Sequence, residues 1–142
     1  MLNPINILQP DANSPPLRLP LYDTKISAGF PSPANEYVGD TLDLNEYLVN
    51  NKTATFFVQV EGDSMIQAGI NEGDILVVDR SITPSHGRIV IARVDNEFTV
   101  KRLYMNNGIR LVAENKNYAP IVPNDLDELE IWGVVTAVVR KT

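Results

Sequence analysis

Proline is concentrated at the start of this chain, and this distribution restricts the fold more than any other feature of the sequence. Seven of the ten prolines fall within the first 33 residues, at positions 4, 10, 15, 16, 20, 31 and 33. Because proline lacks a backbone N–H and clashes with a preceding helical turn, this segment is predicted to form neither a helix nor a central strand. We therefore expect an extended arm ahead of a folded body.

A short helix is predicted after the arm, at residues 43–49 (D-L-N-E-Y-L-V). Asp43 followed three residues later by Glu46 resembles a capping box, and the apolar Leu44 and Leu48 share one face. The pattern indicates a helix of about two turns.

From residue 55 onward the pattern is typical of strands. Runs rich in β-branched and aromatic residues occupy positions 55–60, 75–79, 88–94, 97–104, 109–113 and 130–140. Asp95-Asn96 is a candidate hairpin turn, and Asn106-Asn107-Gly108 is a stronger one because Asn-Gly favours a type I′ turn. The predicted fold is therefore mostly β, a partly barrel-like antiparallel domain with one short N-terminal helix.

Charge and composition exclude several classes of function. The formal net charge is −6, from 12 basic and 18 acidic residues, and no lysine or arginine cluster appears. Direct, specific DNA binding is therefore not expected. No apolar run is long enough to span a bilayer, the start lacks a basic leader, and cysteine is absent. We expect a cytoplasmic protein with no disulfide, metal or cofactor.

Ser64 stands in the turn-like stretch E-G-D-S-M, between two predicted strands. Aspartate and serine are common helix caps, so Ser64 could simply turn the chain and cap a helical turn at residues 65–68. A sharp turn of this kind also lifts a serine hydroxyl out of the backbone and aims backbone N–H groups at a developing oxyanion. Without other information the structural role is favoured, although the local pattern serves either purpose.

A nucleophilic serine needs a base, and two residues could serve. His86 is the single histidine, in the turn-like stretch T-P-S-H-G-R, and any Ser-His-Asp triad would have to use it. Lys101, in the predicted strand E-F-T-V-K-R-L-Y, could form a Ser-Lys dyad or be a solvated strand residue. At the ordinary pKa of about 10.4, only about one lysine in 2,500 is neutral at pH 7, so a catalytic Lys101 must be buried.

The ordered set of motifs G-D-S-M, G-I-N-E-G-D-I-L-V-V-D, H-G-R-I-V-I-A and E-F-T-V-K-R-L resembles the LexA/UmuD family of self-cleaving serine-lysine peptidases, and its UmuD branch in particular. In this resemblance Ser64 falls on the nucleophile position and Lys101 on the general-base position. Ala28-Gly29 resembles the scissile bond. The backbone N–H groups of Asp63 and Ser64 would form the oxyanion hole.

The resemblance implies a peptidase domain at residues 29–142 behind a cleavable arm at residues 1–28. It also implies autoproteolysis stimulated by a RecA–single-stranded DNA filament in the SOS response. The trimmed homodimer would then act as the regulatory subunit of an error-prone translesion polymerase, bound to a Y-family catalytic subunit.

Three other functions stay open at the level of sequence. The chain could be a signal-peptidase-like protease acting on other proteins, although no membrane anchor is evident. It could be the peptidase domain of a LexA-like repressor, although the proline-rich arm leaves no room for a DNA-binding domain before residue 29. It could also be a non-enzymatic β-rich interaction module.

Overall fold

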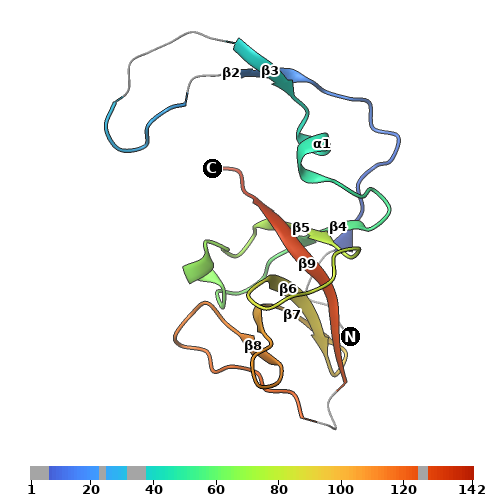
Figure 1. Cartoon of the computed structure of the whole chain (residues 1–142), viewed down its shortest axis with the longest axis vertical. Coiled ribbons are helices and arrows are strands. Elements are labelled where there is room, and N and C mark those ends of the chain that lie inside the picture. The colour runs from blue at the N-terminus through green and yellow to red at the C-terminus, as the bar shows by residue number, and fades with distance from the viewer. Residues whose placement is uncertain (1–6, 23–24, 32–37, 125–127) are drawn as a thin grey trace. The chain divides into compact units, whose positions relative to one another are not determined.

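The strands predicted from residue 55 onward form one antiparallel sheet in the computed structural model (Figure 1). The structure describes residues 7–22, 25–31, 38–124 and 128–142. The chain divides into two units: residues 1–10 with 51–142, and residues 11–50. Parts of the predicted arm, residues 1–6 and 23–24, lie outside the described residues.

The first unit is a seven-stranded sheet in the order β1-β4-β5-β9-β6-β7-β8. Its strands are β1 (Ile7–Leu8), β4 (Thr55–Gln59), β5 (Ile75–Asp79), β6 (Ile89–Val94), β7 (Glu97–Tyr104), β8 (Arg110–Val112) and β9 (Leu129–Val139). A single 3₁₀ turn, η1 (Ile66–Ala68), lies between β4 and β5. The six strands predicted from sequence are confirmed, and so is the mostly β fold class.

Both faces of the central strands are buried. Along β6, Ile91 packs in one apolar cluster with Val58, Met65 and Leu76, while its neighbours Val90 and Ala92 pack in a second. Successive side chains point to opposite faces of a strand, so this alternation means that each face of β6 is covered. Burial on both faces explains why the predicted strands read as continuous apolar runs rather than as alternating ones.

Two tight turns set the register of β6, β7 and β8. Asp95 and Asn96 have φ angles of 50° and 69° and join the paired ends of β6 and β7, Val94 and Glu97. Asn107 and Gly108 have φ angles of 57° and 98° in the loop between β7 and β8. Both predicted hairpins are confirmed, and positive φ at two successive residues is the signature of a type I′ turn.

The second unit contains β2 (Leu19–Tyr22), β3 (Val38–Leu42) and α1 (Leu44–Leu48). The helix begins where the sequence predicts, because the buried Asp43 carboxylate accepts hydrogen bonds from the N–H groups of Asn45, at 2.9 Å, and Leu17, at 3.0 Å. These hydrogen bonds lower the pKa of Asp43, and the bond from Leu17 has the largest effect. Glu46 does not complete a capping box, since its carboxylate pairs with Arg18.

The proline-rich segment supplies two strands that the sequence pattern did not predict. β1 lies at one end of the seven-stranded order, and β2 is half of a two-stranded sheet. Both are edge positions, where a missing backbone N–H is tolerated. Within residues 7–22 and 25–31 this segment forms no helix, as expected.

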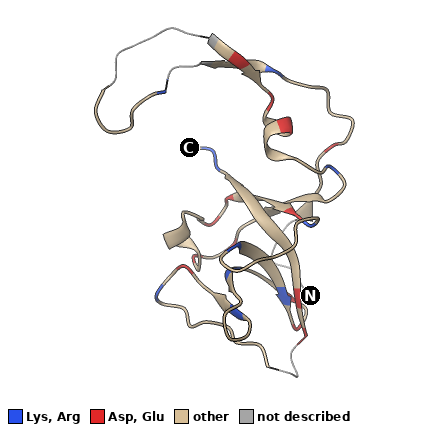
Figure 2. Ribbon diagram, viewed as in Figure 1, with Lys and Arg blue, Asp and Glu red and all other residues tan. Residues whose placement is uncertain are grey.

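Basic and acidic residues are interspersed along the ribbon rather than gathered into a basic stripe (Figure 2). Several arginines are held by carboxylates: Arg80 and Arg93 by Glu130, and Arg140 by Asp74. These carboxylates offset part of the positive charge of the described residues. No described helix is long and apolar enough to cross a membrane.

Gly133 in β9 tests how tightly the central strands pack. A Cβ atom at this position would lie 2.5 Å from Val78 Cγ1 and 3.3 Å from Arg80 Cγ. We predict that Gly133→Ala lowers the free energy of unfolding by about 1–3 kcal/mol, because a buried methyl group has no space there. Urea denaturation measures this, with Gly29→Ala as the control, since nothing lies within 4 Å of a Cβ added at Gly29. Equal stability of the parental protein and Gly133→Ala would contradict the packing described.

Candidate active site

Ser64 lies in a tight turn between β4 and η1. The turn is made by Gly62, with φ of 89°, whose N–H donates to Glu72 Oε1 at 2.9 Å. Next to Ser64, Met65 is inserted into the core with 1% of its surface exposed, which contributes about 1.5–3 kcal/mol of burial free energy. The core thus anchors the residue that follows Ser64 and fixes where the serine is presented.

The hydroxyl of Ser64 does not cap the helical turn, which was the structural alternative suggested by the sequence. The N-cap residue of η1 is Met65, and no side chain caps that turn. The hydroxyl oxygen instead lies 3.0 Å from Lys101 Nζ, across 37 residues of sequence. The fold therefore brings together the two residues that the sequence analysis nominated as nucleophile and base.

Lys101 is held in place by its own strand, β7. Its Nζ donates to Thr99 Oγ1 at 2.7 Å and to the Val100 carbonyl at 3.1 Å, in addition to its contact with Ser64. Thr99 was not nominated from the sequence as a functional residue. Its position two residues before Lys101, on the same face of the strand, was the available signal.

Three contacts suit a neutral amine as well as an ammonium group. A neutral lysine has two N–H donors and one lone pair. The donors match Thr99 Oγ1 and the Val100 carbonyl, which leaves the lone pair directed to the Ser64 hydroxyl. The site therefore satisfies Lys101 in the protonation state in which it can accept a proton.

Burial favours this neutral form. Only 7% of Lys101 is exposed, and desolvation lowers its pKa from the ordinary value of 10.5. Among the described residues no carboxylate forms an ion pair with Lys101, so no ion pair there offsets the desolvation. The condition that sequence alone could not test, a buried Lys101, is met.

His86 makes its contacts elsewhere. Its Nδ1 accepts a hydrogen bond from the Met105 N–H at 2.9 Å, and its ring packs edge-on against Tyr104. No described interaction joins His86 to Ser64. The geometry thus favours the dyad over a histidine triad.

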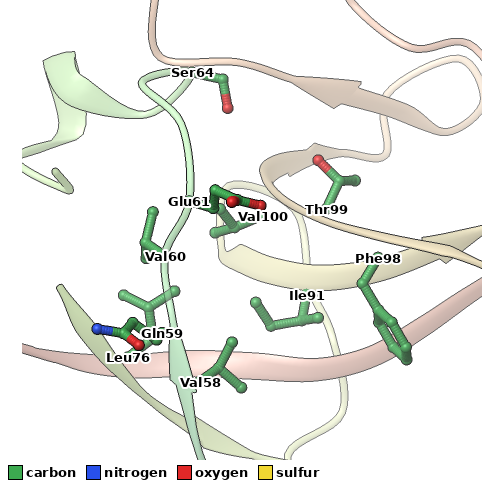
Figure 3. A pocket seen from close by; sticks show the side chains of 10 residues that line it. All are labelled: Val58, Gln59, Val60, Glu61, Ser64, Leu76, Ile91, Phe98, Thr99 and Val100. Carbon is green, nitrogen blue, oxygen red and sulfur yellow. The ribbon is translucent and has the colours of Figure 1, made fainter. Parts of the chain in front are cut away.

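A small cavity opens beside Ser64 (Figure 3). Its volume is about 80 Å³, and its walls combine apolar side chains, among them Val58, Leu76 and Ile91, with polar ones such as Gln59 and Glu61. This is about half of the ~150 Å³ that an engineered cavity needs to hold benzene.

The remaining predicted site residues are placed as follows. The backbone N–H groups of Asp63 and Ser64 donate no hydrogen bond to any of the described residues. Ala28 and Gly29 belong to the second unit, where both are exposed and the Gly29 N–H donates to Ser27 Oγ at 3.2 Å.

Comparison with known proteins assigns the chain to a family. The model of the family described as "Peptidase S24-like" matches residues 20–136. The chain belongs to this family. Its sequence is 48% identical to that of protein SamA of Salmonella typhimurium over 123 residues, covering 87% of this chain and 86% of SamA. It is 50% identical to protein MucA of Escherichia coli over 120 residues, covering 83% of this chain and 82% of MucA.

The S24 chain is also 41% identical to the LexA repressor of Clostridium perfringens, over 71% of this chain and 50% of that repressor. The membership and these relatives confirm the resemblance drawn from sequence. The chain is a serine peptidase of the self-cleaving LexA/UmuD type and is related to the SOS response.

The buried Lys101 gives the S24 chain a testable pH dependence of stability. The pKa of Lys101 is lowered in the folded state, whereas the unfolded chain keeps the ordinary value of 10.5. Between these two values the unfolded state binds more protons, so the contribution of Lys101 to the free energy of unfolding rises with pH. We predict that Lys101→Met is most favoured over the parental lysine at low pH, and that its relative stability falls as pH approaches 10.5.

Urea denaturation over a pH series measures this difference. All proteins should carry Ser64→Ala, so that self-cleavage does not interfere. Lys116→Met is the matched control, because Lys116 is exposed and its replacement should give a difference that does not vary with pH. A difference for Lys101→Met that is equally flat would contradict the burial of Lys101.

Proposed function

We propose that this protein cuts its own chain between Ala28 and Gly29, with Ser64 as the nucleophile and Lys101 as the general base. The observation that carries the proposal is the 3.0 Å separation of Ser64 Oγ and the buried Lys101 Nζ. A serine hydroxyl is a weak nucleophile at neutral pH unless an adjacent base removes its proton.

The reaction takes place in two halves. The lone pair of neutral Lys101 accepts the Ser64 hydroxyl proton while Oγ attacks the carbonyl carbon of Ala28. The resulting oxyanion accepts hydrogen bonds from the N–H groups of Asp63 and Ser64. The C–N bond then breaks, and Lys101 returns its proton to the leaving amine of Gly29. Water, deprotonated by Lys101, hydrolyses the Ser64 ester and regenerates the dyad.

Thr99 has a positioning role in this proposal. Its hydroxyl, 2.7 Å from Lys101 Nζ, and the Val100 carbonyl accept the two N–H bonds of the neutral amine. These bonds fix the direction of the lone pair. The base is then aligned with Ser64 before the substrate arrives, which removes the entropic cost of finding that geometry.

The cavity beside Ser64 supports Ala28 as the residue before the cut. A volume of about 80 Å³ suits a methyl side chain and excludes a large one. On the other side of the bond, Gly29 leaves the backbone uncrowded. The cleavable arm is then residues 1–28, and the product is the peptidase domain at residues 29–142.

For its biological role, we propose that a RecA–single-stranded DNA filament stimulates the cut in the cytoplasm. The trimmed homodimer then serves as the regulatory subunit of an error-prone translesion polymerase, bound to a Y-family catalytic subunit. Membership in the SOS-related S24 group supports this role, as does the coverage of SamA and MucA over more than four fifths of their lengths. The net charge of −6 suits a protein that meets DNA through partners.

The dyad is tested by removing each member. We predict that Ser64→Ala and Lys101→Ala each slow self-cleavage at about pH 9 by at least ~10³-fold, because neither residue can act without the other. Intact-mass measurement over time gives the rate. Ser85→Ala and Lys52→Ala are matched controls at exposed positions and should cleave at the parental rate. Parental cleavage by Lys101→Ala would remove it as the base.

The position of the cut is tested by N-terminal sequencing of the product. We predict a new terminus at Gly29, and a reaction that is slower at about pH 6 than at about pH 9 because protonated Lys101 cannot accept a proton. Ala28→Phe should cut at least ~10-fold more slowly, since a phenyl ring exceeds the cavity. Ala28→Ser keeps a small side chain and should retain most of the rate. A product that begins at any other residue would show that the cut lies at a different peptide bond.

A further inference from the structure

Asp63, the residue before the nucleophile, is held by a turn that the reaction scheme does not use. Asn115 Nδ2 donates to the Asp63 carbonyl at 2.9 Å, and Tyr118 Oη donates to the Asp63 carboxylate at 2.5 Å. Asn115 and Tyr118 are 52 and 55 residues away from Asp63 in the sequence. One short turn therefore contacts both the main chain and the side chain of Asp63.

The turn itself is rigidly made. Asn115 is 6% exposed, its Oδ1 accepts the Asn117 N–H at 3.0 Å, and its carbonyl accepts the Tyr118 N–H at 3.1 Å. A buried side-chain amide with both ends hydrogen-bonded has little freedom to rotate. The amide can therefore define the direction of the Asp63 carbonyl.

The segment just before this turn is fixed to the same site. The Gln67 N–H donates to the Glu114 carbonyl at 2.8 Å, and the Glu114 carboxylate pairs with Arg102 of β7. Arg102 is the neighbour of Lys101, so adjacent residues of one strand hold the base and the segment that contacts Asp63. The 114–118 segment and the Ser64 turn are thus positioned together.

Fixing the Asp63 carbonyl also fixes the next N–H. The peptide between Asp63 and Ser64 is planar and trans, so its C=O and N–H point in opposite directions. The Asn115 bond, shorter than the 3.3 Å bond that the Ile66 N–H also donates to this carbonyl, therefore helps to set the direction of the Ser64 N–H, one of the two donors assigned to the oxyanion. Rotation of this peptide would turn the donor away from the developing charge.

We propose that Asn115, assisted by Tyr118, is a positioning residue that orients the Ser64 N–H for oxyanion stabilisation. This inference rests on the proposed self-cleavage. It divides the work around Ser64 between two groups: Lys101 controls the proton of the side chain, and Asn115 controls the direction of the main chain.

The test separates positioning from mere stability. Asn115→Ala removes the amide, and Asn115→Asp keeps its shape and its acceptor oxygen but cannot donate when ionised. Both variants should lower the plateau rate of self-cleavage at high pH by about 10–100-fold, since misdirected oxyanion donors lose much of their effect. The midpoint of the pH–rate profile should not move, because Lys101 stays buried. Lys116→Gln, at the exposed neighbouring position, is the control and should keep the parental profile.

Two results would overturn the inference. A parental plateau rate in folded Asn115→Ala and Asn115→Asp would show that the bond is irrelevant to the reaction. A midpoint shifted up toward 10.5 would show that the variants act by exposing Lys101. Should both Asn115 variants fail to fold, Tyr118→Phe keeps the ring and removes the exposed hydroxyl, and it should lower the plateau severalfold; an unchanged plateau there would count against the inference.

A second readout does not depend on cleavage. The ¹⁵N order parameter of the Ser64 amide, measured at about pH 6.5, should fall in Asn115→Ala, because the Asp63 carbonyl then keeps only the longer bond from the Ile66 N–H, at 3.3 Å. An unchanged order parameter would overturn the inference even in a chain that does not cut itself. Absence of parental self-cleavage would instead refute the proposed function and leave this readout to decide on Asn115.

Discussion

The desolvation of Lys101 is the constraint on which the rest of the site depends. An amine in water is protonated at neutral pH and cannot take a proton from a serine, whereas an amine with 7% of its surface exposed loses much of the hydration that favours the charge. This burial is an unfavourable contribution to folding, because the unfolded chain solvates the ammonium group freely. The sheet compensates with the apolar clusters around Val58, Leu76 and Ile91. Function and stability are opposed at this residue.

One strand and one turn position the two residues of the dyad. Lys101 lies on β7, where it is paired with Val90 of β6, and the next residues of the strand pair with β8. Ser64 lies on a turn whose next residue, Met65, is buried in the core. A rigid strand therefore carries the base, and a core-anchored turn carries the nucleophile.

Much of the fold could be predicted from local sequence, because its signals are local. The runs of β-branched residues marked the six strands β4 to β9, and Asn107-Gly108 and Asp95-Asn96 adopted the backbone that their residue types favour. β1 escaped prediction because two paired residues, Ile7 and Leu8, make no periodic pattern. The capping box was half right: Asp43 caps α1, but the more distant Arg18 binds Glu46.

The candidate site likewise contains residues that local sequence can indicate and contacts that it cannot. Ser64 and Lys101 could be nominated because ordered motifs surround them, yet their contact and the burial of Lys101 are products of strand pairing, which no local pattern contains. No sequence motif marks Asn115 or Tyr118 as a functional residue. Their bonds to Asp63 span 52 and 55 residues, and only the fold makes them neighbours. Contacts of this range are set by topology rather than by propensity.

The central claim is that Lys101 acts as a neutral base because the fold buries it. The most direct measurement is a heteronuclear NMR titration of the Lys101 side chain in Ser64→Ala, compared with the pH–rate profile of the parental chain. The account predicts that Lys101 titrates below the ordinary pKa of 10.5 and that the cleavage rate rises with the same midpoint. A Lys101 that titrates at or above 10.5, or a cleavage midpoint unrelated to its titration, would contradict the account.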